Sequence, residues 1–142
     1  MILRAVEKSD LDTFFEQQRD ADASAMAGVP MRDRFSFEER WDVVLTHPQI
    51  VIRTIDEDGA VAGYVFTFPM NDELRIGYWL GRAFWGRGVA SAAVEAFLRL
   101  DERRPICATV SPENAASIRI LERNGFEQTG SPGEHGLHFV LG

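Results

Sequence analysis

Two residue types are almost missing from this chain of 142 residues, which has one cysteine, Cys107, and one lysine, Lys8. A single cysteine excludes an internal disulfide and any zinc site built from several cysteines. Cys107 lies in the apolar run Ile106–Val110, where a small buried hydrophobe is the ordinary interpretation. The single lysine follows Glu7, so it excludes a Walker A nucleotide loop, which needs Gly-Lys-Ser/Thr.

Long apolar runs and positive charge are also scarce. No apolar stretch approaches the ~18 residues of a membrane-spanning helix, and Met1 is followed by a short strand-like segment rather than a signal peptide. We therefore expect a cytoplasmic protein with no membrane partner. Lys+Arg number 15 against 22 Asp+Glu, a formal net charge of −7. This balance argues against a nucleic-acid partner, whose phosphates require a basic surface.

The rest of the composition is that of an ordinary globular chain, with 45% hydrophobic and 26% charged residues. No linker, internal repeat or low-complexity tract interrupts it. Residues 1–142 are therefore predicted to form one domain.

The first half of the chain predicts a strand, two helices and a meander. The strand is Ile2–Val6, one helix starts at Ser9, and the second starts at the capping box Ser36–Glu39. Between the helices, Asp22–Met31 is expected to be a loop or a broken helix. Three strands follow: Gln49–Ile55, Val61–Phe68 and Leu74–Leu80.

The second half alternates helices with strands. An apolar stripe of helical period begins at Val89 and ends at Leu100, and Ile106–Val110 resembles a buried parallel strand. A helix at Asn114–Asn124 should end at Gly125 in the left-handed conformation. Strands from Phe126 and at Leu137–Leu141 close the chain. The predicted class is α/β with a mixed sheet, in the order β-α-α-β-β-β-α-β-α-β-β.

A glycine-bearing turn joins the third meander strand to the next helix. Gly86 and Gly88 let the backbone approach a ligand and turn N–H groups toward it. The first amides of a helix also attract negative charge, so the turn predicts a phosphate or pyrophosphate site. Arg87 adds a cation and Arg82 is a second candidate. A tight strand-to-helix connection would explain the same glycines.

A dinucleotide-binding fingerprint is excluded at this turn. Ser91 stands where that fingerprint needs its last glycine. No Asp or Glu follows about 20 residues later, near Ile106, to bind a ribose.

A second segment, Ala108–Glu127, joins a buried strand to a helix and then to a Gly-Phe turn. Together the two segments resemble the GNAT superfamily of acetyl-coenzyme-A-dependent N-acyltransferases, in particular the Rim-type ribosomal-protein N-terminal acetyltransferases and their small relatives. Family phrases of the kind GYW…WGRG-[IV]-A and N-x-x-S-x-[RK]-[VIL]-L-E-[KR]-x-GF match Gly77 to Ala90 and Asn114 to Phe126. The resemblance implies a GNAT fold whose central strands splay apart.

The resemblance also implies acetyl-CoA as the co-substrate. Pantetheine would lie between the splayed strands and pair with backbone groups of Tyr78, Trp79 and Leu80. The pyrophosphate would lie on consecutive amides: Gly86, Arg87, Gly88, Val89, Ala90 and Ser91. Trp85 stands at the first position of the same motif, where the superfamily at large has Arg or Gln.

Two residues of the second motif are candidate coenzyme A contacts. Asn114 matches the residue whose side-chain amide contacts the pantetheine arm, and it is also a good helix N-cap. Ser117 lies three residues later on the same helical face. By resemblance it points toward coenzyme A or the thiolate leaving group; a solvated helix serine is the alternative.

The resemblance implies direct acetyl transfer to a primary amine in a ternary complex. The backbone N–H of Leu80 is expected to stabilise the oxyanion. Many relatives have a tyrosine as thiolate acid where this chain has Leu121, which leaves Ser117 or water. Relatives often have a glutamate where this chain has Arg75, and we expect Glu73, on the same strand face, to replace it as the base. Glu73 could instead belong to the preceding turn.

The acceptor is open: a small-molecule amine or a peptide or protein N-terminus. Aromatic residues could line its pocket or belong to the core: Phe35, Phe37, Trp41 and Phe68. Acidic residues of the N-terminal segments could attract a cationic amine or be solvated: Asp20, Asp22, Asp33, Glu38 and Glu39.

A different class of protein, a non-catalytic acyl-CoA-binding sensor, is the alternative, because the tyrosine is missing and Arg75 replaces a glutamate. A homodimer is possible, since dimers are common among relatives. His135 and His138 lack a third ligand in the sequence, so we predict no metal site.

Overall fold

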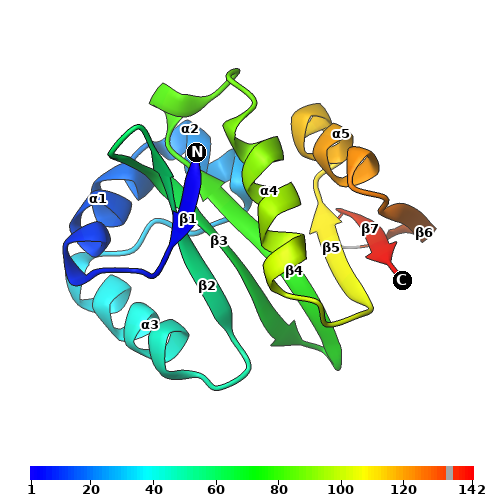
Figure 1. The fold of residues 1–142 in the computed structure, drawn as a ribbon, viewed down its shortest axis with the longest axis horizontal. Helices are drawn as coiled ribbons and strands as arrows, with labels where there is room; N and C mark the ends of the chain where they lie inside the picture. The colour runs from blue at the N-terminus through cyan, green and yellow to red at the C-terminus, as the bar shows by residue number, and fades with distance from the viewer. Residues whose placement is uncertain (134–135) are drawn as a thin grey trace.

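A mixed seven-stranded sheet forms the centre of the molecule, in the order β1-β2-β3-β4-β5-β7-β6 (Figure 1). The computed structural model describes residues 1–133 and 136–142. Its neighbouring strands are antiparallel except for β4 and β5, which are parallel. The strands are β1 (Ile2–Arg4), β2 (Val51–Glu57), β3 (Ala60–Met70), β4 (Glu73–Leu80), β5 (Ile106–Val110), β6 (Glu127–Gly133) and β7 (Gly136–Leu141).

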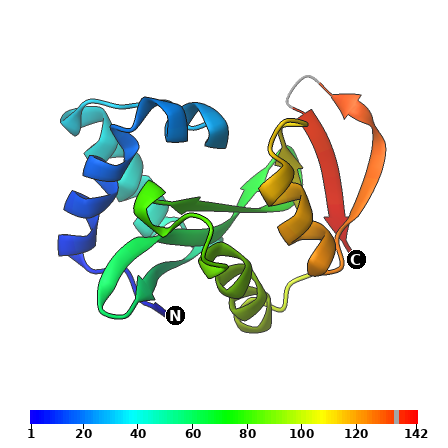
Figure 2. The same cartoon turned by 90° about the horizontal axis from the view of Figure 1, so that it is seen from above.

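Helices cover both faces of this sheet. Figure 2 shows the first three helices (blue to cyan) on one face and α4 (olive green) on the other. None of the helices in the described residues is long and apolar enough to cross a membrane. The helices are α1 (Lys8–Gln18), α2 (Ala21–Ala27), α3 (Arg34–Thr46), the short 3-10 helix η1 (Arg82–Phe84), α4 (Val89–Leu100) and α5 (Ala115–Arg123).

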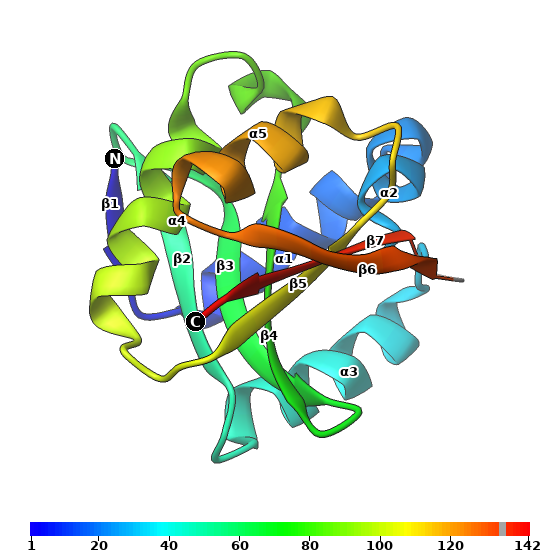
Figure 3. The ribbon, with the colours of Figure 1, turned by 90° about the vertical axis from the view of Figure 1, so that its right-hand side faces the viewer.

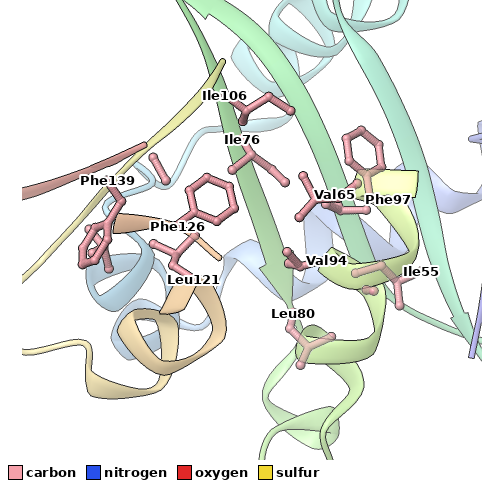
Figure 4. Packing of buried hydrophobic residues seen from close by; sticks show 14 of the residues in the cluster. Ile55, Val65, Ile76, Leu80, Val94, Phe97, Ile106, Leu121, Phe126 and Phe139 are labelled. Atoms are coloured by element: carbon pink, nitrogen blue, oxygen red, sulfur yellow. The ribbon is translucent and has the colours of Figure 1, made fainter. Parts of the chain in front are cut away.

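Each face of the sheet has its own core. On the α4 and α5 face, Val94, Phe97 and Leu121 pack over Val65 and Ile76 of the central strands (Figure 4). The opposite face carries an aromatic cluster under α1 and α3: Phe14, Phe37, Trp41, Val44 and Ile52. The alternation of side chains along β2 and β3 supplies both cores from the same strands.

The predicted order of elements is confirmed with one addition. The segment expected to be a loop or broken helix contains α2, which Asp20 caps by accepting from the Ala23 N–H at 3.2 Å. Gly28 ends it in the left-handed conformation. The capping box expected at Ser36 is wrong: α3 starts two residues earlier, because Asp33 is the N-cap and accepts from the Ser36 N–H at 2.8 Å.

The far end of α4 is held to the sheet by a buried carboxylate. Asp101, directly after α4, accepts a hydrogen bond from the Thr67 hydroxyl of β3 at 2.5 Å and from the Arg103 guanidinium at 2.7 Å. The Arg103 hydrogen bonds lower the pKa of Asp101 to about 2, although burial opposes this. The carboxylate is therefore ionised at neutral pH, and it fixes where α4 ends against β3.

Candidate active site

The sheet opens between β4 and β5. β3 and β4 stay in register from Gly63↔Leu80 to Met70↔Glu73, whereas β4 and β5 pair at one position, Arg75↔Cys107. In Figure 1 the two arrows start close together at the lower right and separate upward, and in Figure 3 β5 and β7 run obliquely across the line of β4. The splayed strands expected from the sequence are therefore present.

The backbone of β4 presents hydrogen-bonding groups to this opening. The Gly81 N–H donates to the Ala62 carbonyl of β3 at 2.8 Å. Because backbone groups alternate between the two edges of a strand, those of Trp79 also face β3, and those of Tyr78 and Leu80 face the other edge. Past the single pairing with β5, the N–H groups of Tyr78 and Leu80 are thus directed into the opening.

Trp85 fixes the end of β4. Its indole Nε1–H donates to the Leu80 carbonyl oxygen at 2.9 Å. The hydrogen bond joins the strand end to the turn that leads into α4. It gives Trp85 a structural role at the motif position where the superfamily at large has Arg or Gln.

The turn before α4 has the geometry of an anion cradle. Gly86 and Gly88 have φ of 76° and 74°, and nothing lies within 4 Å of a Cβ built on either. Gly88 is the N-cap of α4 and brings no side-chain cap, so the first amides of the helix stay available. Arg87 is exposed, with its guanidinium 5.8 Å from the Phe84 ring centroid. These residues fit a phosphate group.

Arg82, in the same turn, is paired with carboxylates of α2 and its N-cap. Its guanidinium donates to both carboxylate oxygens of Asp20, at 2.6 and 2.7 Å, and lies 3.4 Å from Asp22. Arg82, the second candidate for a phosphate cation, thus forms an ion pair that ties the turn to the start of α2. The hydrogen bonds that Arg82 donates to Asp20 raise the pKa of Arg82, so it remains protonated.

A hydroxyl pair bridges β4 and α5. The Tyr78 hydroxyl is hydrogen-bonded to the Ser117 Oγ, and the Asn114 Oδ1 accepts from the Ser117 N–H at 3.2 Å. Asn114 is thus the N-cap of α5, as its ordinary interpretation predicts. Burial raises the pKa of Tyr78, and the Ser117 hydrogen bond partly offsets this. Leu121 is 4% exposed, in the core.

The Tyr78 hydroxyl was missed by the sequence analysis, which considered only the backbone of that residue. Its partner Ser117 lies 39 positions later in the chain. The only signal in the sequence was a tyrosine on the strand face shared with Ile76 and Leu80, which the period of two could have placed toward α5.

Glu73 belongs to a charged chain at the closed end of the opening. Its carboxylate accepts from Arg75 at 3.0 Å and is 2.9 Å from the His138 Nε2, while the His138 Nδ1 is 2.7 Å from the Thr129 hydroxyl. Burial would raise the pKa of Glu73, but Arg75 and His138 outweigh it and lower the pKa. Seven residues of extended strand, about 23 Å, separate Glu73 from Leu80. A proton could travel between them only through water.

The same end of β4 brings together three potential metal ligands. One ligand atom from each of Glu73, Cys107 and His138 lies within 4.8 Å of the others. These neighbours of His138 were not predicted from the sequence, because they lie far away in the chain, on β4 and β5. The Glu73 carboxylate already has Arg75 and His138 as partners. His135 lies outside the described residues.

A cavity of about 380 Å³ lies on the α1–α3 side of the opening. Its lining includes Gly77, Tyr78 and Trp79 of β4 and Thr109 of β5, so the cavity reaches the opening between these two strands, which is also called the split below. Of the four aromatic candidates, three line the cavity, and Phe35 does not, being 72% exposed. The three are Phe37, Trp41 and Phe68.

The acidic residues expected near the acceptor do not line this cavity. Asp20 and Asp22 pair with Arg82, Asp33 caps α3, and Glu38 pairs with Arg34 at 2.8 Å. Each of these four carboxylates has a partner outside the cavity, and Glu39, the fifth candidate, is exposed on α3.

A split sheet, an anion cradle at the start of a helix and a cavity at the split together define an acyl-CoA-dependent acyltransferase fold. The chain belongs to the GNAT acetyltransferase family: the family described as Acetyltransferase (GNAT) domain matches residues 1–127. A relative from Bacillus licheniformis, described as uncharacterized N-acetyltransferase p20, is 37% identical over 86 residues, which are 57% of this chain and 48% of that protein. The match thus spans about half the length of this curated relative.

Solved structures show the same fold. Spermidine N-acetyltransferase from Vibrio cholerae, in complex with CoA and spermine, has a TM-score of 0.82 at 17% identity, covering 98% of this chain and 92% of that one. A ribosomal-protein-alanine N-acetyltransferase from Brucella melitensis, from the branch that the sequence resembles, has a TM-score of 0.82 at 17% identity, covering 99% of both chains.

Gly63 tests the geometry of β4. A Cβ built on Gly63 would lie 1.9 Å from the Trp79 carbonyl oxygen, a backbone atom. Gly63→Ala should therefore displace β4 and lower the free energy of unfolding by roughly 1–3 kcal/mol, measured by urea denaturation. The matched control is Gly133→Ala in β6, where the nearest atom is 3.9 Å away. Equal losses in the two variants would contradict the close approach.

Proposed function

We propose that this protein is an acetyl-CoA-dependent N-acetyltransferase that transfers an acetyl group to a primary amine directly, in a ternary complex. The observation that carries the proposal is the opening beyond Arg75↔Cys107, where N–H groups of β4 face away from β3. The anion cradle lies at the same end of β4, and the cavity opens from the split. Family membership supports the same activity.

The co-substrate would be held mainly by backbone groups. Amides from Gly86 to Ser91, with the charge of Arg87, suit the pyrophosphate. The Tyr78 and Leu80 backbone suits the pantetheine arm, and Trp79, whose own groups face β3, would contribute by holding the strand. Asn114 keeps its side-chain NH₂ for the same arm while its oxygen caps α5. Acetyl-CoA, when bound, supplies a thioester whose carbonyl carbon accepts the amine.

The chemistry assigns one task to each group. The amine nitrogen bonds to the acetyl carbon and the carbon–sulfur bond breaks. The Leu80 N–H stabilises the negative charge that develops on the carbonyl oxygen. A proton from the Ser117–Tyr78 hydroxyl pair, or from water, neutralises the leaving thiolate, and the surplus proton of the acylated nitrogen replaces it. Glu73 would accept the proton of the ammonium group through intervening water.

Several expectations go with this proposal. The acceptor would be either a small-molecule amine or a peptide or protein N-terminus. No metal ion would take part, and neither nucleic acid nor a membrane would be a partner. A cytoplasmic location and a homodimer are predictions of the same kind.

The cradle is tested by two glycines that share a conformation. Gly88 and Gly130 both have positive φ, 74° and 65°, and open space around the Cβ position. An alanine at either should cost roughly 1–2 kcal/mol of stability. Only Gly88→Ala should also weaken coenzyme A binding, about tenfold by calorimetry, because it turns the amides of the cradle.

Two measurements distinguish an acetyltransferase from a protein that only binds acyl-CoA. Release of coenzyme A from acetyl-CoA in the presence of amines is the result that the enzyme predicts. Thermal stabilisation by acetyl-CoA without release, across a broad amine panel, would instead identify a non-catalytic acyl-CoA-binding sensor.

The role of Glu73 is tested by pH. Because its folded-state pKa is lowered below the ordinary 4.5, the carboxylate is ionised at neutral pH and loses its charge only as the pH falls below that value. If Glu73 is the base, kcat/KM should decrease as the pH falls through the pKa of Glu73. Glu73→Gln should then reduce kcat/KM at every higher pH and remove this acid-side decrease. An unchanged pH–rate profile in the variant would remove Glu73 from the mechanism.

A further inference from the structure

The charges that line the cavity are of one sign. Three arginines, Arg32, Arg40 and Arg75, are among the lining residues, and the described lining contains no aspartate or glutamate. The whole chain has the opposite balance, a net charge of −7. The cavity is therefore a local positive region on an acidic protein, and its charge selects for a negative group on the molecule that enters.

Arg32 is held in place by the buried side chain of Gln18. The Gln18 amide, 6% exposed, donates to the Arg32 carbonyl at 2.7 Å and accepts from the Arg32 N–H at 2.9 Å. The two hydrogen bonds fix the backbone of Arg32 in the segment between α2 and α3. Its guanidinium reaches the Ser36 hydroxyl, at 3.2 Å. Such support preorganises a binding residue.

Arg40 and Arg75 complete the positive side. Arg40 is exposed on α3, and no carboxylate of the described residues lies within 4.0 Å of its guanidinium or that of Arg32. Arg40 and Tyr64 both line the cavity, and burial raises the pKa of Tyr64 to about 12. Arg75 binds Glu73 through Nε and Nη2.

The body of the cavity is aromatic. The Trp41 and Tyr64 rings meet edge to face with centroids 4.9 Å apart, and Phe66 stacks on Phe68 at 4.7 Å. These rings offer an apolar surface to a ligand and few hydrogen bonds. The cavity volume, about 380 Å³, lies near the lower end of the range for small-molecule sites.

We propose that the acceptor is a small amine that carries a carboxylate and an apolar or aromatic body, as an α-amino acid does. The carboxylate pairs with Arg32 and Arg40, the body lies on the aromatic wall, and the amine points to the split at Tyr78 and Leu80. This inference rests on the proposed acetyl transfer. It sets the protein apart from the Vibrio cholerae structure, whose bound spermine is a polycation.

The positive lining would also prepare the nucleophile. An ammonium group among arginines loses its proton more readily, because like charges disfavour the charged form. The fraction of neutral amine at a given pH is then larger. This effect lowers the demand on a general base at the position that Arg75 occupies.

Matched amines test the substrate class through coenzyme A release. The probes are phenylalanine, its carboxamide, 2-phenylethylamine and spermidine, which share a primary amine and differ in charge. We expect kcat/KM for phenylalanine to exceed that for each of the other three by at least about tenfold, since a charge-assisted contact is lost or repulsion is gained.

Variants test which residues bind the carboxylate of the proposed substrate. Arg32→Gln and Arg40→Gln should each lower kcat/KM for phenylalanine about tenfold, mainly through KM, and lower the ratio of kcat/KM for phenylalanine to that for 2-phenylethylamine at least about tenfold. The matched control is Arg99→Gln, an exposed arginine of α4 that pairs with Glu95 outside the cavity. Arg40→Glu should shift the preference toward the amines that have no carboxylate.

The outcomes separate this inference from the proposed function. Equal or faster turnover of 2-phenylethylamine, the carboxamide or spermidine would leave the acetyltransferase standing and overturn the carboxylate preference. Loss of activity toward every amine alike in the two arginine variants would overturn it as well. Coenzyme A binding with no release from any amine would instead refute the proposed function.

Discussion

The missing hydrogen bonds between β4 and β5 are the constraint on which the rest of the site depends. A strand in the middle of a sheet normally has partners on both edges, and unpaired edge groups bind another extended chain readily. Here β4 is paired along its length with β3 and at one position with β5. Its remaining edge is therefore a ready site for an extended ligand, and Gly63 and Trp85 hold the strand where this edge is presented.

The two sides of the opening have different chemistry. On the α4 and α5 side, the glycine cradle, Asn114 and the Tyr78–Ser117 pair suit a long anionic co-substrate. On the α1–α3 side, the cavity has an aromatic wall and three arginines, and the buried Gln18 side chain holds the backbone of one of them, Arg32. Two carboxylates of the N-terminal segments are used in other contacts: Asp20 pairs with Arg82, and Asp33 caps α3.

Local patterns predicted much of this architecture. The bounds of α4 and β5 follow from the apolar stripe after Gly88 and from the apolar run around Cys107, and Gly125 has the expected left-handed conformation, with φ of 89°. The family motifs led to the split and the cradle. What the sequence could not give are partners distant along the chain: Arg82 with Asp20, and Glu73 with His138, 62 and 65 positions apart. Which carboxylate meets which cationic side chain is decided by the packing of whole elements.

Hydrogen exchange at individual amides of β4 tests the central claim most directly. Acetyl-CoA or coenzyme A at saturation should slow exchange at Tyr78 and Leu80, which face the opening, much more than at Trp79, which is paired with β3 in both states. Unchanged exchange at Tyr78 and Leu80 in the saturated protein, or equal slowing at all three amides, would contradict a ligand paired to the free edge of β4.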